Sequence, residues 1–309
     1  MLEIVPSVAT QAASATNQVI VFGMDERIMG VIIAIIVAIV CFGGIKRIAT
    51  VTDKMVPIMA IVYMIGALII FVANITAVPK AFGLIFANAF TGHAAVGGFA
   101  GATLKAALRW GAARGVYSNE AGMGTAPAAH VAAEVDHPIR QAIWGVFEVI
   151  VDTMIVCTFT ALAVLVSGVW TGEGASANPG NLAQLAYGSV FGNFGNIFVA
   201  VCVFFFVLST IIVITHYGER QAEFLFGSGF AKIWRWIYIV ATLVGGLGIT
   251  LERLYSLTDF LLGIIIIPNM LAVILLVPQV KELQDEYFNT PGKYYLADMA
   301  AKEQAKANK

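Results

Sequence analysis

Charged residues are scarce in this sequence of 309 residues. Asp, Glu, Lys and Arg together make up 12% of it, against about a quarter in an ordinary soluble domain. The formal net charge of -1 leaves no excess of basic side chains, which argues against a nucleic-acid partner. Hydrophobic residues reach 59% and the mean hydropathy is +0.85. The composition therefore predicts an all-α protein that crosses a membrane several times.

Cysteine is also rare. The three cysteines, Cys41, Cys157 and Cys202, lie in apolar runs, where a thiol behaves as a small buried hydrophobic group. They indicate neither a disulfide framework nor a metal site. The N-terminus has no basic segment followed by an apolar core and a small-residue cleavage site, so we expect no cleaved signal peptide.

Long apolar runs set the expected membrane spans, because a helix of roughly 20 apolar residues crosses a bilayer. Such runs cover residues 28–45, 55–79, 141–170, 189–217, 234–251 and 260–280, and the more polar run 4–22 reads as the end of another span. Polar loops are expected at 134–140, 171–181 and 219–230, and a surface or re-entrant helix leading into a short half-span at 81–104. We expect one transmembrane domain over 1–280, with about seven spans and a partial N-terminal one, and a charged tail over 281–309.

Basic residues indicate which side of the membrane each loop faces, because cytoplasmic loops carry an excess of Lys and Arg. If the spans alternate, one side collects Lys46, Arg47, Lys54, Arg140, Arg220, Lys232, Arg235 and Lys281, and the other collects Arg27, Lys80 and Arg253. Lys105, Arg109 and Arg114 fit a surface helix. We expect a multi-pass protein of the cell membrane, plasma or inner, whose C-terminus is cytoplasmic.

One stretch interrupts the apolar pattern. Residues 116–130 read VYSNEAGMGTAPAAH, where Gly122, Gly124 and Pro127 favour broken backbone. Irregular backbone at membrane depth needs partners from protein or a wet cavity, and in secondary transporters the solute sits at such breaks. We expect a half-helix to resume over 122–133. The alternative is a loop at the membrane surface, since Gly and Pro also mark ordinary loops.

This stretch, followed by HPIRQA and VDTMIVCTFTAL, closely resembles the alanine or glycine:cation symporter family, also called sodium:alanine symporters. The resemblance continues through GGIKRIATVTDKMVP, STIIVITHYGER and IPNMLAVILL. It implies a LeuT-type fold of two inverted five-helix repeats, with an amino acid and Na+ bound at broken helices. It also implies sodium-coupled symport of alanine or glycine, with Na+ as the coupling ion and no other cofactor.

Mapped onto that fold, the chain begins within the third core helix and lacks the first two. The break at Ser118–Gly124 corresponds to the sixth core helix of that fold. The first core helix is the other broken one and supplies much of the carboxylate and sodium site in this fold. We therefore expect residues 1–309 not to transport alone, because of a truncated gene model or a partner segment encoded upstream.

The resemblance assigns substrate contacts to the SNEAGxG motif. Ser118, Asn119, Gly122 and Gly124 match it, and free carbonyls with the Asn amide suit a substrate ammonium group. Leu at Asn119 or Gly122 is expected to abolish substrate binding. Gln11 falls in a stretch resembling the family's QANS, where it either hydrogen-bonds the substrate or holds helices together. Ala13 stands where the family usually has Asn.

A second group lies in STIIVITHYGER. Ser209 and Thr210 match the family's STIL motif, and their hydroxyls suit Na+ or a substrate amine, although such hydroxyls also bond their own helix. Ile214 stands where the family commonly has Trp, and His216 where it prefers Tyr. The smaller Ile214 is expected to enlarge the pocket for the substrate side chain and to widen specificity.

Three carboxylates within expected spans leave their roles open. Glu120 is either a charged partner for the site or a tie for the unwound backbone. Glu148 and Asp152, at i and i+4, are expected to share one helix face, and bracing of neighbouring helices is favoured over proton relay or cation binding.

Other functions fit less of the sequence. His130, Glu134 and His137 share a helical face at i, i+4 and i+7 and form a weak metal motif. An intramembrane hydrolase using Asp152 or His130 has no Gly-Asp pair, HExxH or Ser-Lys dyad in its support. A non-transporting fragment, or a channel or receptor-like scaffold on the same fold, is the remaining alternative.

Overall fold

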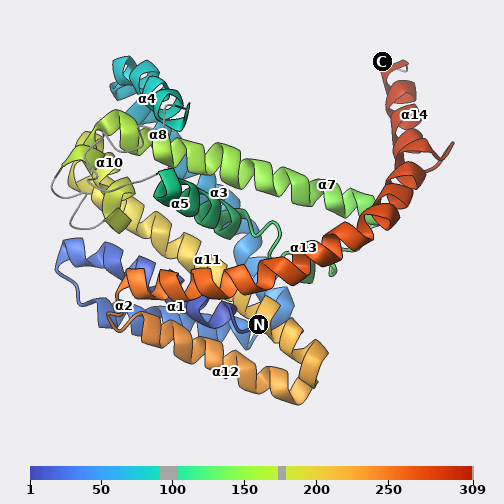
Figure 1. Cartoon of the computed structure of the whole chain (residues 1–309), viewed down its shortest axis with the longest axis horizontal. Helices are drawn as coiled ribbons and strands as arrows, with labels where there is room; N and C mark the ends of the chain where they lie inside the picture. Colours follow the sequence, from blue (N-terminus) through green and yellow to red (C-terminus); the bar gives the residue numbers. More distant parts are fainter. Residues whose placement is uncertain (91–103, 173–178, 308–309) are drawn as a thin grey trace.

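The computed structural model describes residues 1–90, 104–172 and 179–307, and within these ranges every regular element is a helix. The α-helices, drawn in Figure 1, are α1 (Ile4–Val19), α2 (Glu26–Cys41), α3 (Gly44–Ala73), α4 (Val78–Phe90), α5 (Leu104–Asn119), α6 (Pro127–His130), α7 (Pro138–Val149), α8 (Cys157–Ser167), α10 (Leu182–Phe191), α11 (Asn193–Phe226), α12 (Ser228–Gly245), α13 (Leu251–Asn289) and α14 (Tyr294–Ala307). A π-helical segment, Ile150–Val156, joins α7 to α8.

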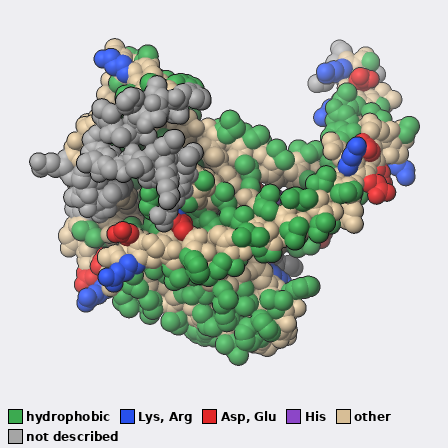
Figure 2. Space-filling view, in the orientation of Figure 1, with side chains coloured by type: hydrophobic (Ala, Val, Ile, Leu, Met, Phe, Trp, Pro, Cys, Tyr) green, Lys and Arg blue, Asp and Glu red, His purple; other side chains and the backbone are tan. Residues whose placement is uncertain are grey.

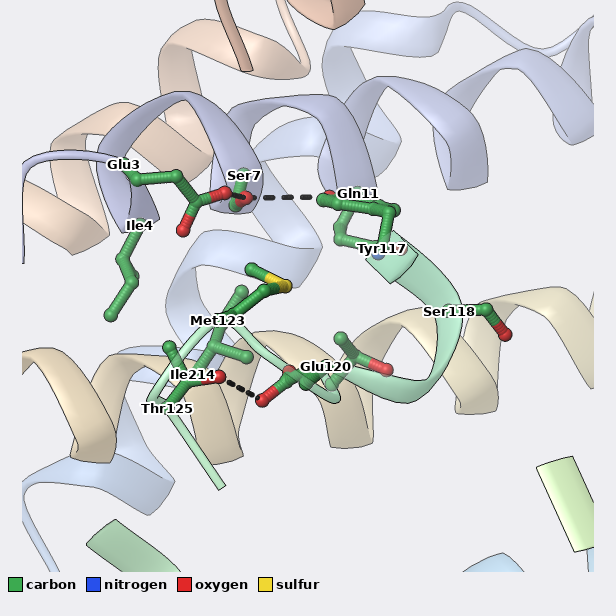
Figure 3. Close-up of a pocket in the computed structure, with 11 residues that line it drawn as sticks. Glu3, Ile4, Ser7, Gln11, Tyr117, Ser118, Glu120, Met123, Thr125 and Ile214 are labelled. Atoms are coloured by element: carbon green, nitrogen blue, oxygen red, sulfur yellow. Dashed lines mark hydrogen bonds between the residues drawn. The ribbon is translucent and has the colours of Figure 1, made fainter. Parts of the chain in front are cut away.

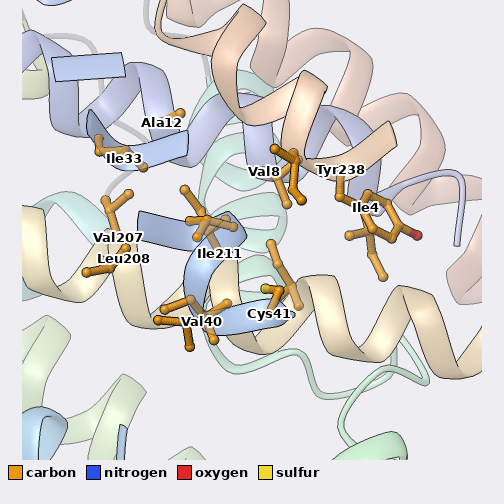
Figure 4. Packing of buried hydrophobic residues seen from close by; sticks show 14 of the residues in the cluster. Ile4, Val8, Ala12, Ile33, Val40, Cys41, Val207, Leu208, Ile211 and Tyr238 are labelled. Carbon is orange, nitrogen blue, oxygen red and sulfur yellow. The ribbon is translucent and has the colours of Figure 1, made fainter. Parts of the chain in front are cut away.

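Helix α11 is the centre of the packing. Its residues around Ile211 pack with α1, α2 and α12 in one cluster of buried aliphatic side chains, several of which are labelled in Figure 4. Its earlier part, around Val199, packs in a second cluster with α3, α8 and α10, where Tyr187 is fully buried. The all-round apolar character of α11 matches this position between two groups of helices.

Glycines allow three helices to approach closely. A Cβ added at Gly245 of α12 would lie 2.2 Å from the carbonyl oxygen of Ala9 on α1. A Cβ at Gly30 of α2 would lie 2.7 Å from the Cα of Gly246. Such small-residue contacts are typical of helix packing inside a bilayer, where they bring backbones together.

The apolar surface agrees with a multi-pass membrane protein. In the described residues four regions are long and apolar enough to cross a membrane, namely Met55–Ala73, Pro138–Ser167, Asn193–Phe226 and Leu251–Ala307. Figure 2 shows hydrophobic side chains over most of the visible faces of α12 and α13, with charged side chains on the arm that ends in α14 and at the left-hand end of the molecule. The total number of crossings stays a prediction.

Several expected boundaries need correction. The turn expected over 219–230 is mostly helix, because α11 continues to Phe226 and the chain turns only at Gly227, whose φ is +87°. The intervening residues favour helix, and Gly227 is the first that adopts a left-handed angle easily. Part of the expected loop 134–140 belongs to α7, which starts at Pro138.

Other expected segments differ less from the structure. Helix α13 runs without interruption past Val280 to Asn289, so the expected tail begins inside a helix. Helix α4 covers the first part of the expected segment 81–104, of which residues 91–103 lie outside the described ranges. Residues 173–178 of the expected loop 171–181 also lie outside them.

The close contact between α1 and α12 predicts a stability effect. Gly245→Ala adds one methyl group against the Ala9 carbonyl, and such overpacking costs about 1 to 3 kcal/mol. We expect a lower Tm for this variant in detergent. Gly263→Ala on α13, where an added Cβ meets nothing within 4 Å, is the matched control and leaves Tm unchanged or raised. Equal Tm values for both variants would contradict the packing described.

Candidate functional site

The expected break in the backbone is confirmed. Helix α5 ends at Asn119, and the chain stays non-helical to Ala126. Glu120, Gly122 and Gly124 have φ of +56°, +90° and +79°, angles that a right-handed helix does not contain. The half-helix expected over 122–133 is wrong, because the positive angle at Gly124 delays the restart and α6 is a single turn, Pro127–His130.

Two side chains at the end of α5 tie the break to the π-helical segment. The amide oxygen of Asn119 accepts the backbone N–H of Ala121 at 2.9 Å, and its Nδ2 donates to Thr153 Oγ1 at 2.9 Å. The hydroxyl of Ser118 donates to the carboxylate of Asp152. Polar side chains of the π-helical segment therefore hold the end of α5, where the break begins.

Glu148 and Asp152 do not act as one pair. The backbone N–H of Cys157 bonds the Asp152 carbonyl, five residues back, so Asp152 lies in the π-helical segment, whereas Glu148 lies in α7. The Glu148 carboxylate lies 3.5 Å from His130 Nε2, after the break, whereas Asp152 meets Ser118 before it. The shared helix face stays a prediction, and the contacts are of the kind that the bracing role favoured by the sequence requires.

A cavity of about 290 Å³ lies beside the break. Its lining residues are Glu3, Ile4, Ser7, Gln11, Tyr117, Ser118, Glu120, Met123, Thr125, Thr210 and Ile214, from α1, the end of α5, the break and α11. Figure 3 shows Glu120 held by Thr125, whose hydroxyl donates to its carboxylate at 2.6 Å. The volume is at the small end of ligand pockets, which run from about 300 to 1,000 Å³.

Four predicted site residues, Gln11, Ser118, Thr210 and Ile214, line this cavity. They come from three separate helices, which the sequence alone does not place together. The Thr210 hydroxyl donates to the Phe206 carbonyl at 2.8 Å, so in this state it bonds its own helix while it faces the cavity.

Asn119, Gly122, Gly124 and Ser209 lie outside the lining. The two glycines and Asn119 shape the break, and the buried Ser209 donates to the Phe206 carbonyl at 2.9 Å. Their expected contacts with substrate or cation stay predictions.

From α1 the sequence predicted Gln11 but missed Glu3 and Ser7. Glu3, Ser7 and Gln11 are spaced four residues apart and face the cavity from one side of the helix. Glu3 is 2% exposed and accepts a hydrogen bond from Ser7, whose oxygen in turn accepts from Tyr117 Oη at 3.4 Å. This i, i+4, i+8 spacing of polar residues was a signal available in the sequence.

The three histidines that the structure describes do not line this cavity. His130 ends α6 and His137 caps α7 by accepting the Ile139 N–H, so the helical face expected to include Glu134 does not exist. His216 is buried on α11 and lines a separate cavity near Glu219 and Arg235. It does not contact the cavity beside the break.

Comparison with known proteins points to one family. A sequence model of the sodium:alanine symporter family matches residues 2–298. The chain is 45% identical over 300 residues to the uncharacterized transporter YflA of Bacillus subtilis, covering 97% of this chain and 63% of YflA.

Two further relatives have named substrates. The chain is 36% identical over 255 residues to the sodium/alanine symporter AgcS of Methanococcus maripaludis, covering 82% of this chain and 55% of AgcS. It is 34% identical over 255 residues to the probable sodium/glutamine symporter GlnT of Bacillus subtilis, covering 82% of this chain and 52% of GlnT. The chain thus spans between half and two thirds of the length of these relatives.

The link between the break and the π-helical segment predicts energetic coupling. Asn119→Leu and Thr153→Val each remove one partner of the same hydrogen bond, which is worth about 0.5 to 1.5 kcal/mol. We expect each variant to lower Tm in detergent and the double variant to lose less than the sum. Fully additive losses would show that the two side chains do not interact.

Proposed function

The chain belongs to the sodium:alanine symporter family, whose members are transporters and not enzymes, and we propose that it carries the substrate site of a sodium-coupled symporter for a small neutral amino acid. The single observation that carries this proposal is the polar cavity of about 290 Å³ at a backbone break. Helical breaks in secondary transporters are where solutes bind.

The end of α5 supplies one part of the proposed chemistry. The last carbonyls of a helix have no intrahelical partner and sit at the negative end of its dipole. The substrate ammonium group therefore binds near the end of α5 and the Glu120 carboxylate, which lines the cavity. Gln11 hydrogen-bonds the substrate from α1.

Helix α11 supplies the other part. Thr210 offers an oxygen to Na+ or to the amine once its hydroxyl turns, and Ser209 adds a second oxygen to the proposed cation site. Hydroxyl oxygens are suitable ligands for a hard cation. Ile214, one turn further along α11, faces the substrate side chain.

The fold proposed for this function is the LeuT type, with α5 and the break as one of its broken helices. Residues 1–280 form its membrane domain and 281–309 a cytoplasmic tail, in the cell membrane. Support comes from the observed break and from the basic residues that the positive-inside rule places on one side. Alanine and glycine are the proposed substrates.

Sodium-dependent uptake tests the proposal. Labelled alanine is offered to proteoliposomes that contain the full chain, with an inward Na+ gradient or with K+ in its place. A second arm places residues 2–298 into the matching part of AgcS, with AgcS itself as the positive control. We expect Na+-driven uptake in at least one arm. Its absence from both, with AgcS active and all proteins folded, would overturn the proposed function.

Thr210 gives this assay a site-specific variant. Thr210→Val keeps the shape of the side chain but removes its oxygen, and a lost hydrogen bond to a charged group costs about 1.5 to 3 kcal/mol. We expect at least about a tenfold rise in the concentration of Na+ or alanine needed for half-maximal uptake. Thr242→Val, which removes a buried hydroxyl that bonds its own helix outside the cavity, is the control. If Thr210→Val leaves the half-maximal concentrations of both Na+ and alanine unchanged, Thr210 binds neither of them.

Ile214 predicts a wider specificity. Because it leaves more room than Trp, longer or branched neutral amino acids should compete with alanine for uptake. Ile214→Trp should reduce that competition and leave glycine uptake largely intact. A chain that already accepts only alanine and glycine would contradict the proposed role of Ile214.

A further inference from the structure

We propose that Asn269 is a positioning residue for the substrate site, which it shapes by holding the broken backbone from α13. It lies in IPNMLAVILL, a motif to which the proposed function assigns no role. Its link to transport rests on the proposed function, whereas its effect on the break does not.

One hydrogen bond and one close approach join Asn269 to the break, and its neighbour Met270 adds a second close approach. Its Nδ2 donates to the carbonyl oxygen of Gly122 at 2.8 Å. A Cβ added at Gly124 would lie 2.6 Å from Asn269 Oδ1. A Cβ added at Gly122 would lie 3.4 Å from the sulfur of Met270. The break therefore closes onto this part of α13, and both glycines leave room for it.

A side-chain donor is needed at this place. The Gly122 peptide is outside any helix, and its carbonyl needs a partner because hydrocarbon offers none. The backbone N–H groups of α13 are engaged in their own helix, so they are not free to donate. An amide side chain at position 269 supplies the donor without adding a charge.

Helix α13 also contacts the chain on both sides of the break. Before it, Arg114 pairs with Asp259, and the Tyr117 and Tyr255 rings lie 6.4 Å apart. After it, the His137 and Tyr287 rings lie 5.2 Å apart. Asn269 lies between these two contacts, so α13 is one continuous support for α5, the break and α7.

The Gly122 carbonyl is close to the lining of the cavity. Met123, its next residue, and Glu120, two residues before, both face the cavity (Figure 3). Fixing the Gly122 peptide therefore fixes the direction in which these two side chains project. Asn269 does not line the cavity, so it acts through the backbone and not on the solute.

Hydrogen exchange of the full chain in detergent tests the structural part. Asn269→Leu keeps a similar volume but leaves the Gly122 carbonyl without its donor. We expect exchange in a peptide covering 118–125 to rise at least about fivefold, the effect of one unsatisfied buried group. Asn74→Leu is the matched control, because Asn74 Nδ2 also donates to a backbone carbonyl, that of Ile70 at 3.0 Å, away from the cavity. The control leaves exchange over 118–125 unchanged.

Uptake kinetics test the link to transport. Asn269→Leu should raise the KM for alanine about tenfold with a smaller effect on maximal rate, since the site is misplaced and not removed. Gly124→Ala, which pushes against Asn269 Oδ1, should raise KM too, and the two changes together should have less than their combined effect. Asn269→Gln keeps the amide donor and should recover part of the affinity.

The outcomes separate the two proposals. Exchange over 118–125 that does not change in Asn269→Leu overturns the positioning role. Faster exchange with an unchanged KM also overturns it, because the break would then not control the site. Faster exchange in a chain that takes up no amino acid in either arm of the uptake assay overturns the proposed function and leaves the support of the break by Asn269 established.

Discussion

The need of unpaired peptide groups for hydrogen-bond partners is the constraint on which this structure depends. Between Asn119 and Pro127 the chain leaves the helix, so its peptide groups lack the partners that a helix supplies. The Asn119 side chain accepts the Ala121 N–H, and Asn269 donates to the Gly122 carbonyl. These polar side chains come from separate helices and converge on one short segment.

The surrounding helices make that arrangement possible. Helix α11 joins two apolar clusters, and close contacts at Gly245 bring α1 and α12 together. This packing holds the polar face of α1, with Glu3, Ser7 and Gln11, opposite the break. The cavity is thus a polar space that remains where an interrupted helix meets a rigid apolar frame.

The sequence predicts the break well, because Gly122, Gly124 and Pro127 stand out in an apolar chain. It predicts most helices from their apolar runs. It also predicts Gln11, Thr210 and Ile214 as site residues, and all three line the cavity. It fails where local register changes. No apolar periodicity indicates the π-helical segment that joins α7 to α8.

Long-range partners are the other failure. The Asn269 side chain meets a carbonyl 147 positions away, and neither residue's neighbours in the sequence indicate that contact. The role of α1 was within reach, since its polar residues repeat every four positions, but their common target lies on α5, the break and α11. Tertiary packing decides which polar helix face lies opposite the break, and the sequence does not show that packing.

The central claim is that the cavity beside the break binds the amino acid together with Na+. Its most direct test uses Gln11→Cys in a chain whose Cys41, Cys157 and Cys202 are replaced by Ala, labelled with a small thiol reagent. The account predicts that alanine slows labelling in Na+ but not in K+, whereas Ser256→Cys, exposed on α13, reacts at one rate throughout. A Gln11→Cys labelling rate that alanine does not change in Na+, in a protein that still binds alanine, would contradict it.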